Sequence, residues 1–164
     1  MTLARIALVA GLLALVTPAA AGSTAQEEAN KRTVLEFYDK ALNQKDFEGA
    51  AKHFGPRYIQ HNPNAADGIE GFKKFIEFRR EKFPNAKSDI KRALVDGDMV
   101  VLHVHSVREP GERGVAIVDI FRLENGRIVE HWDVVQPIPD RLGRASVMTQ
   151  HESQSRPALG QRFA

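Results

Sequence analysis

Polar side chains able to do chemistry lie within four stretches of strongly β-forming residues. These are "RYIQHNPNAADG" (57–68), "LHVHS" (102–106), "IVDIF" (117–121) and "VEHWDVVQ" (129–136). Imidazole, carboxylate and amide groups placed this way suit metal binding, or hydrogen bonding and proton transfer in a pocket. Enough ligands for zinc or iron are present: His61, His103, His105, Asp119 and His131. The question is whether these groups meet in one place.

The elements that must position them change type along the chain. Apolar residues recur at helical spacing over about 25–43, over 47–54 behind Asp46 as N-cap, and over about 68–83. "YIQHN" (58–62) is predicted as a short strand between the last two helices. After residue 87 the period becomes two, and four strands are predicted over 88–96, 98–109, 113–124 and 126–137. Asp96-Gly97 and Asn125-Gly126 are strong hairpin signals between them.

Helices followed by a strand meander predict an α+β fold. We expect three N-terminal helices packed in the concave face of a curved antiparallel sheet, forming a cone with an internal cavity. Side chains alternate along a strand, so polar groups two residues apart share a face. The shared faces are Ile117/Asp119/Phe121, His131/Asp133/Val135 and His103/His105. We predict that these faces converge on the cavity.

Each of these residues also has a structural interpretation. Asp119 could pair with Arg122 or Arg108 at the surface. His131 and Asp133 could form a buried structural pair, and His61 and Asn62 could form the turn before Pro63. Trp132 is interpreted as core or dimer packing rather than a substrate platform.

Composition narrows the function classes. The chain has 164 residues, enough for one domain, and a formal net charge of +2. Its densest basic cluster, within 79–82, alternates with glutamates and is predicted to be a solvated helix face. No basic stripe is paired with aromatics, so nucleic acid is not an expected partner. The chain has no cysteine, which excludes disulfides, thiolate metal sites and cysteine nucleophiles.

The first 21 residues resemble a secretory signal peptide. Arg5 precedes an apolar run over 6–16, and "AAA" at 19–21 offers a cleavage site. We therefore expect an exported, periplasmic or secreted bacterial protein, with no stable membrane anchor after cleavage. An uncleaved anchor is the alternative. The domain is predicted over 25–140, and 141–164 is a polar C-terminal tail.

Three segments carry a resemblance to a known family. "VLEFYDKALNQKDFEGAAKHF", "YIQHNPNAADGIEGF" and "VDIFRLENGRIVEHWDVVQPIP" resemble the SnoaL-like polyketide cyclases of the nuclear transport factor 2-like superfamily, over about residues 30–140. That resemblance implies a cone-shaped α+β barrel, a homodimer, and intramolecular aldol condensation without metal or cofactor. The superfamily hosts many chemistries, so the site must decide the function.

The resemblance also assigns roles. Asp119 resembles the family's acid/base aspartate, with His105 and His131 as further catalytic groups; its apolar neighbours Ile117 and Phe121 would desolvate such a base. The implied substrate-binding residues are Tyr58, Gln60, His61, Asn62, His103 and Phe121.

The expected function is a cofactor-independent acid/base enzyme, of cyclase or isomerase type, acting on a small apolar carbonyl compound. Two alternatives remain: an exported small-molecule-binding module without catalysis, and a metal-dependent enzyme using the His-x-His pair.

Overall fold

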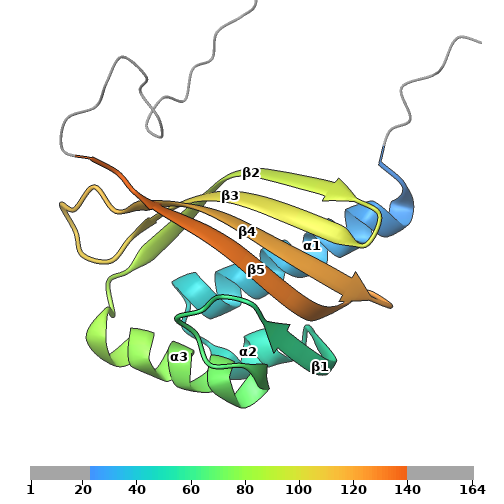
Figure 1. Ribbon diagram of the computed structural model, residues 1–164, viewed down its shortest axis with the longest axis horizontal. Helices are drawn as coiled ribbons and strands as arrows, with labels where there is room; N and C mark the ends of the chain where they lie inside the picture. Colours follow the sequence, from blue (N-terminus) through green and yellow to red (C-terminus); the bar gives the residue numbers. More distant parts are fainter. Residues whose placement is uncertain (1–22, 140–164) are drawn as a thin grey trace, which may run out of the picture.

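The computed structural model describes residues 23–139, and in them helices precede most of a five-stranded sheet (Figure 1). The elements are α1 (Ala25–Tyr38), the π-helical turn η1 (Asp39–Asn43), α2 (Phe47–Ala51), β1 (Phe54–Gln60), α3 (Gly68–Lys82), β2 (Lys87–Asp96), β3 (Met99–Val107), β4 (Val115–Glu124) and β5 (Arg127–Pro137). The expected signal peptide (1–21) and polar tail (141–164) lie outside the described residues. Within 23–139, no helix is long and apolar enough to cross a membrane.

The sheet confirms the α+β prediction and its meander. Its strand order is β1-β5-β4-β3-β2, and β2 to β5 pair antiparallel with their neighbours in sequence. Asn125 and Gly126 both have positive φ, as a two-residue turn between β4 and β5 requires. The edge strand β1 pairs parallel with β5, so the sheet is mixed rather than wholly antiparallel. The helices cover one face of this curved sheet, and no helix of residues 23–139 covers its other face (Figure 1).

One predicted boundary is wrong. Phe54 was expected at the end of the second helix and the next strand at 58–62, but α2 ends at Ala51 and β1 runs from Phe54 to Gln60. Pro56 lacks a backbone N–H and cannot donate a hydrogen bond to a neighbouring strand. An edge strand tolerates proline because one side of it is unpaired, and the irregular register between Phe54 and Ile59 absorbs the disruption.

The core lies between the helices and the concave face of the sheet. It is rich in aromatic rings: Phe37 of α1 contacts Phe54, Phe72 and Phe121 with ring centroids 5.1 to 5.7 Å apart. Val100, Leu102 and Val104 of β3 are fully buried beneath them. This packing fixes α1 and α3 over the sheet, and the polar side chains described next lie in the remaining space.

Candidate active site

A cavity of about 500 Å³ lies between the helices and the sheet. That volume is within the roughly 300–1,000 Å³ usual for small-molecule sites. Apolar side chains of α3 and β5 form part of its wall, and three of them are substantially exposed: Phe75, Phe78 and Val135. Polar groups are concentrated deeper in: Tyr38, Tyr58, Gln60, Asn62, Arg79, Asp119, His131 and Asp133.

Asp119 of β4 is the most enclosed carboxylate in the lining. The residue is 5% exposed. Its Oδ2 accepts a hydrogen bond from the Tyr38 hydroxyl of α1 at 3.0 Å, and its Oδ1 lies 3.1 Å from Nε2 of His131. Asp119 is directly opposite Asp133 in the β4–β5 ladder, and Phe121 is opposite His131, so both strands turn their polar groups to the same side.

The protonation of His131 is set by a chain of hydrogen bonds that begins in the backbone. Gln60 Oε1 accepts from the backbone N–H of Asn62 at 2.9 Å, which fixes the orientation of the Gln60 amide. The same oxygen lies 3.0 Å from Nδ1 of His131. A carbonyl oxygen only accepts, so Nδ1 must carry a proton and donate it. Therefore Nε2 is the nitrogen that faces Asp119.

Asp119 and His131 consequently share one proton. Nε2 and the Asp119 carboxylate face each other at 3.1 Å, and a hydrogen bond between them needs a proton on one of the two. The proton lies either on an imidazolium beside a carboxylate or on a carboxylic acid beside a neutral imidazole. Either state gives the cavity a proton donor and acceptor fixed in place by its neighbours.

Tyr58 supplies a hydroxyl donor to the same space. Its oxygen accepts from Nε2 of Gln60 at 3.0 Å. Burial raises the pKa of Tyr58, and the negative charges of Asp119 and Asp133 raise it further. The phenol therefore keeps its proton at neutral pH, and no acceptor for that proton is found in residues 23–139. Burial, followed by the charge of Asp119, also raises the pKa of Tyr38.

Three side chains of the site have donor atoms that could hold a metal ion. Ligand atoms of Asp119, His131 and Asp133 lie within 4.8 Å of one another. Each is already engaged: Asp119 with His131, and both Asp133 oxygens with Nδ2 of Asn62 at 2.8 and 2.7 Å. In this structure the donors of Asp119 and His131 therefore bond each other, and those of Asp133 bond Asn62.

Six residues expected at the site do line the cavity. They are Tyr58, Gln60, Asn62, Asp119, Phe121 and His131. His61 does not, because it follows Gln60 on the opposite side of the chain. Its ring stacks on Trp132 with centroids 4.6 Å apart, and its Nε2 lies 2.8 Å from Glu130. Trp132 likewise lies on the sheet's other face.

The prediction that His103 and His105 face the cavity is wrong. Leu102 is paired with Asp119 in the β3–β4 ladder, and Val104 is paired with Ile117, so the even-numbered residues of β3 point inward. His103 bonds Arg92 and His105 bonds the Arg113 carbonyl, both on the outer face. The alternation of side chains along a strand places the two histidines on one face of β3. It does not identify that face, because the β3–β4 loop sets which residues of β3 lie opposite Asp119.

Among the polar residues of the cavity that the sequence analysis did not assign to a site are Tyr38 and Arg79. Arg79 was predicted to be on a solvated helix face, but it is 7% exposed. The helical spacing contained the signal: Arg79 follows Phe72 by seven residues and Ile76 by three, and both are buried on the same stripe of α3. The helical spacing over 25–43 predicts Tyr38 as a core residue, and in the structure its hydroxyl donates to Asp119.

Comparisons with known proteins agree with this architecture. The profile of the SnoaL-like domain family matches residues 34–131. Comparison with curated proteins gives no match.

Several solved structures share the fold. One is described as a SnoaL-like polyketide cyclase from Jannaschia sp. CCS1 (23% identity, 70% of this chain and 90% of that chain, TM-score 0.58). Another is AclR from Streptomyces galilaeus, described as a hydroxylase (21%, 67% and 90%, 0.57). A third is an NTF2-like protein from Cytophaga hutchinsonii (23%, 66% and 90%, 0.55).

At these identities the solved structures establish the fold alone, and a fold by itself does not determine an activity. The family profile covers more than half of the chain and includes Tyr38, Asp119 and His131. The chain therefore belongs to the SnoaL-like domain family.

Proposed function

We propose that the protein is a cofactor-independent acid/base enzyme acting on a small carbonyl compound. The observation that carries this proposal is the Asp119–His131 pair, whose Oδ1 and Nε2 lie 3.1 Å apart in the wall of a largely apolar cavity. Removing a proton from carbon next to a carbonyl needs a base held within hydrogen-bond reach in a desolvated site. Asp119 suits this role because it lines the cavity, is 5% exposed and is held in place by Tyr38 and His131.

The proposed step moves one proton and one electron pair. A carboxylate oxygen of Asp119 takes the proton from the carbon adjacent to the carbonyl, and the C–H electron pair becomes the enolate. The Tyr58 hydroxyl donates a hydrogen bond to the enolate oxygen, where negative charge develops. The His131 imidazolium stays beside Asp119 and offsets the charge in the site.

Two outcomes are open to such an enolate. Its carbon can attack a second carbonyl in the same molecule, and the resulting alkoxide takes the proton back from Asp119; this is an aldol ring closure. Alternatively, protonation at another carbon gives an isomerisation. Both end with the original protonation state of Asp119, so neither needs a co-reactant.

Solvent-deuterium exchange tests the proposal without knowledge of the natural substrate. Cyclic ketones, β-keto esters and small aromatic ketones are first screened for binding by thermal shift. Exchange at the acidic carbon of each hit is then followed by NMR in deuterated buffer. Catalysed exchange supports the enzyme. Binding of several hits with no exchange above the buffer rate would instead support a non-catalytic binding module.

A parallel metal measurement addresses the remaining alternative. We expect protein purified without chelator to contain no stoichiometric zinc or iron, since Asp119, His131 and Asp133 are engaged in hydrogen bonds. Elemental analysis decides this. Near-stoichiometric metal, with exchange lost on chelation, would replace the metal-free step.

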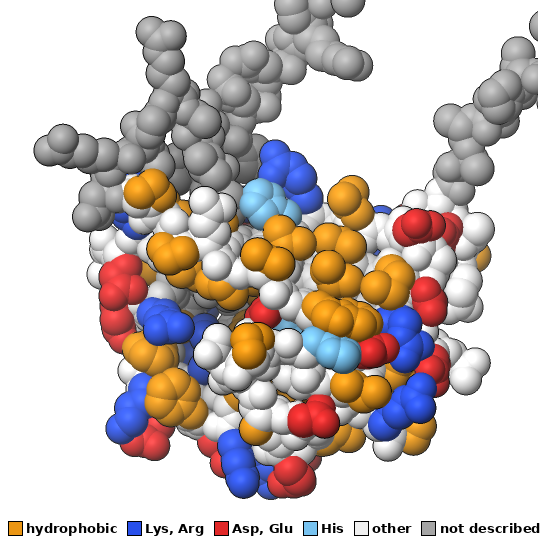
Figure 2. Space-filling view, viewed as in Figure 1, with side chains coloured by type: hydrophobic (Ala, Val, Ile, Leu, Met, Phe, Trp, Pro, Cys, Tyr) orange, Lys and Arg blue, Asp and Glu red, His pale blue; other side chains and the backbone are white. Residues whose placement is uncertain are grey.

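We also propose that the outer face of the sheet forms a homodimer interface. Leu94, Val118 and Val134 are 64%, 37% and 66% exposed there. Figure 2 shows apolar side chains gathered over β4 and β5 on this face. Exposed apolar side chains gathered on a sheet face favour a partner. Light scattering should give a dimer mass for the wild type and a monomer mass for Val134→Asp; a monomeric wild type at all concentrations would contradict this.

A further inference from the structure

Arg79 places an unpaired cation in the cavity. The residue is 7% exposed, yet its Nε and Nη2 have no hydrogen-bond partner in the part of the chain that the structure describes. Its guanidinium carbon lies 5.7 Å from the centre of the Phe75 ring. Burying a charge without a partner is unfavourable, so such groups are nearly always paired in a folded protein. The partner of Arg79 is therefore to be sought in a ligand.

The surrounding side chains do not supply a counter-charge. Two carboxylates line the cavity, and each is bound elsewhere: Asp119 by Tyr38 and His131, and Asp133 by Asn62. The other arginine of the lining, Arg108, is a second cation. Burial lowers the pKa of Arg79, and repulsion from Arg108 lowers it further. A guanidinium nevertheless remains charged in proteins.

The two nitrogens without a partner specify the geometry of the missing group. Both are closed to solvent in this structure, so a ligand reaches them only when a neighbouring side chain shifts. The N–H bonds of Nε and Nη2 lie along one edge of the planar guanidinium and point the same way. This edge matches the two oxygens of a carboxylate in a bidentate pair. The neighbouring walls are aromatic, with Phe72, Phe75 and Phe78 in the lining. A carboxylate on an apolar body fits this better than a phosphate dianion.

We propose that the Nε–Nη2 edge of Arg79 binds the carboxylate of a small oxo acid whose apolar body fills the cavity. Tyr38 belongs to both ends of the site, because its hydroxyl bonds Asp119 and its side chain lines the same cavity as Arg79. The position of the ligand's ketone beside Asp119 rests on the proposed function, whereas the anion site does not.

The test compares acids with their own esters. Levulinate and β-benzoylpropionate carry a ketone and a carboxylate, and their methyl esters keep the size and remove the charge. Calorimetric titration of the wild type should show at least one acid binding about tenfold or more tightly than its ester, as expected for a charge-assisted bidentate pair. Equal affinities, or no acid binding at millimolar concentration, would overturn the proposal.

Variants on one helix locate the effect. Arg79→Met should abolish the preference for the acid, and Arg79→Lys should keep only part of it, because an ammonium lacks the fork. Arg80→Met is the matched control, since Arg80 is the next residue of α3 and is exposed. It should leave the preference unchanged. A preference retained in Arg79→Met would overturn the proposal.

Stability of the free protein separates a ligand site from a structural residue. Because Arg79 lacks a partner, Arg79→Met should unfold at the same temperature as the wild type or higher. A clear fall in the unfolding temperature would show that Arg79 supports the fold, and would overturn the proposal.

Solvent-deuterium exchange at the carbon next to the ketone distinguishes the anion site at Arg79 from the proposed enzymatic function. In Asp119→Asn, the acid preference should persist while exchange next to the ketone is lost. A wild type that prefers the acid but catalyses no exchange would retain the anion site and refute the enzyme.

Discussion

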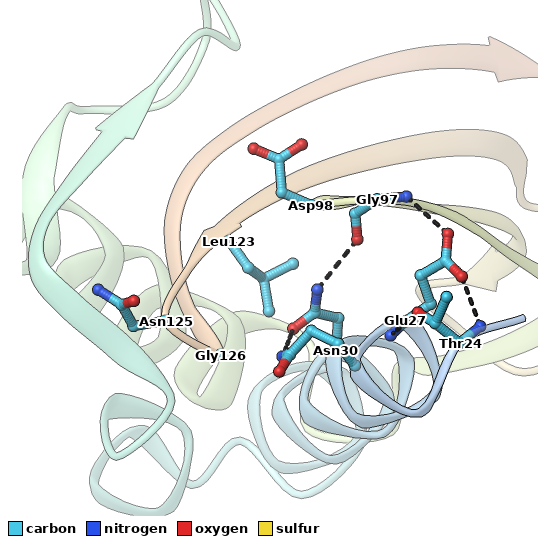
Figure 3. A pocket seen from close by; sticks show the side chains of 9 residues that line it. Thr24, Glu27, Asn30, Gly97, Asp98, Leu123, Asn125 and Gly126 are labelled. Carbon is cyan, nitrogen blue, oxygen red and sulfur yellow. Dashed lines mark hydrogen bonds between the residues drawn. The ribbon is translucent and has the colours of Figure 1, made fainter.

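Two hollows of similar size, about 480 and about 500 Å³, differ in how their polar groups are paired. The smaller lies where α1 begins against the β2–β3 turn (Figure 3). There Glu27 accepts from the backbone N–H of Thr24 and of Gly97, and Asn30 donates to the Gly97 carbonyl. In the larger hollow, Arg79 has two nitrogens without a partner in the described residues.

This difference in pairing distinguishes a structural contact, here called the α1–turn contact (Glu27 and Asn30 with Gly97), from a binding site. Where side chains satisfy one another across two elements, as Glu27 and Asn30 do with the turn, the polar groups stabilise the fold and have little left to offer a ligand. Where buried groups keep a donor without an acceptor, as Arg79 and Tyr58 do, a ligand is needed to complete the hydrogen bonding of the cavity. Substitutions in the two hollows should therefore have different consequences.

The largest expected effect is on turnover, in the cavity. Asp119→Asn keeps the shape, because the amide can still accept from Tyr38 and can donate to a neutral His131. It removes the base, so the rate of proton exchange should fall by about 100-fold or more. Rates measured under saturating substrate, with affinity checked by calorimetry, test this. Equal exchange in both proteins would remove Asp119 from the role of base.

The next largest expected effect is on stability, at the α1–turn contact. Asn30 is 4% exposed, and Asn30→Ala leaves the Gly97 carbonyl without its side-chain donor. The free energy of unfolding should fall by about 0.5–1.5 kcal/mol, the usual net worth of one hydrogen bond, because Gly97 is exposed and water can reach its carbonyl. Urea unfolding measures it, and exchange activity should be unchanged. Loss of activity with unaltered stability would mean that this hollow, too, serves a ligand.

A smaller effect is expected in the pH dependence of stability. The Gly97 backbone N–H lowers the pKa of Glu27 from its usual 4.5, and hydrogen bonds from Thr24 lower it further. Because the folded pKa is the lower one, this stabilisation is present above the unfolded value and is lost as pH falls through the folded value.

Glu27→Gln provides the matched comparison. The wild type should be the more stable protein at neutral pH, and the difference should shrink as the pH is lowered below 4.5. Urea midpoints at several pH values check this. A stability difference that stays constant over that pH range would show that the carboxylate charge of Glu27 does not stabilise the α1–turn contact.

Sequence periodicity predicted the architecture well but only part of the site. It placed Asp119 and Phe121 on one face of β4 and His131 and Asp133 on one face of β5, and the register confirms that these faces meet. Two short hairpin turns left little freedom in that part of the chain. The parallel pairing of β1 with β5 is non-local, and no turn joins those strands, so the sequence could not specify it.

The errors share a physical cause. The residue types of His103, His105 and Arg79 were judged without the tertiary neighbours that decide their direction. The β3–β4 loop sets the direction of the two histidines, and the stripe of Phe72 and Ile76 sets that of Arg79. Polar type alone favoured the histidines as site residues, and charge alone favoured a solvated arginine. In the structure, packing places the two histidines outside the cavity and the arginine inside it.

The smallest expected effect concerns one of those histidines, and it tests which face of β3 belongs to the site. Nε2 of His105 lies 2.7 Å from the Arg113 carbonyl at an exposed position on the outer face. His105→Ala removes that bond where water can replace it, so stability should change by no more than about 0.5 kcal/mol. Exchange activity should stay within about twofold of the wild type, because His105 is not among the residues that line the cavity. His131→Ala, made alongside, removes the imidazole that bonds Asp119 and should slow exchange far more. A tenfold or larger loss in His105→Ala, with the fold intact by circular dichroism, would place the reaction on the outer face and contradict the assignment of the cavity as the active site.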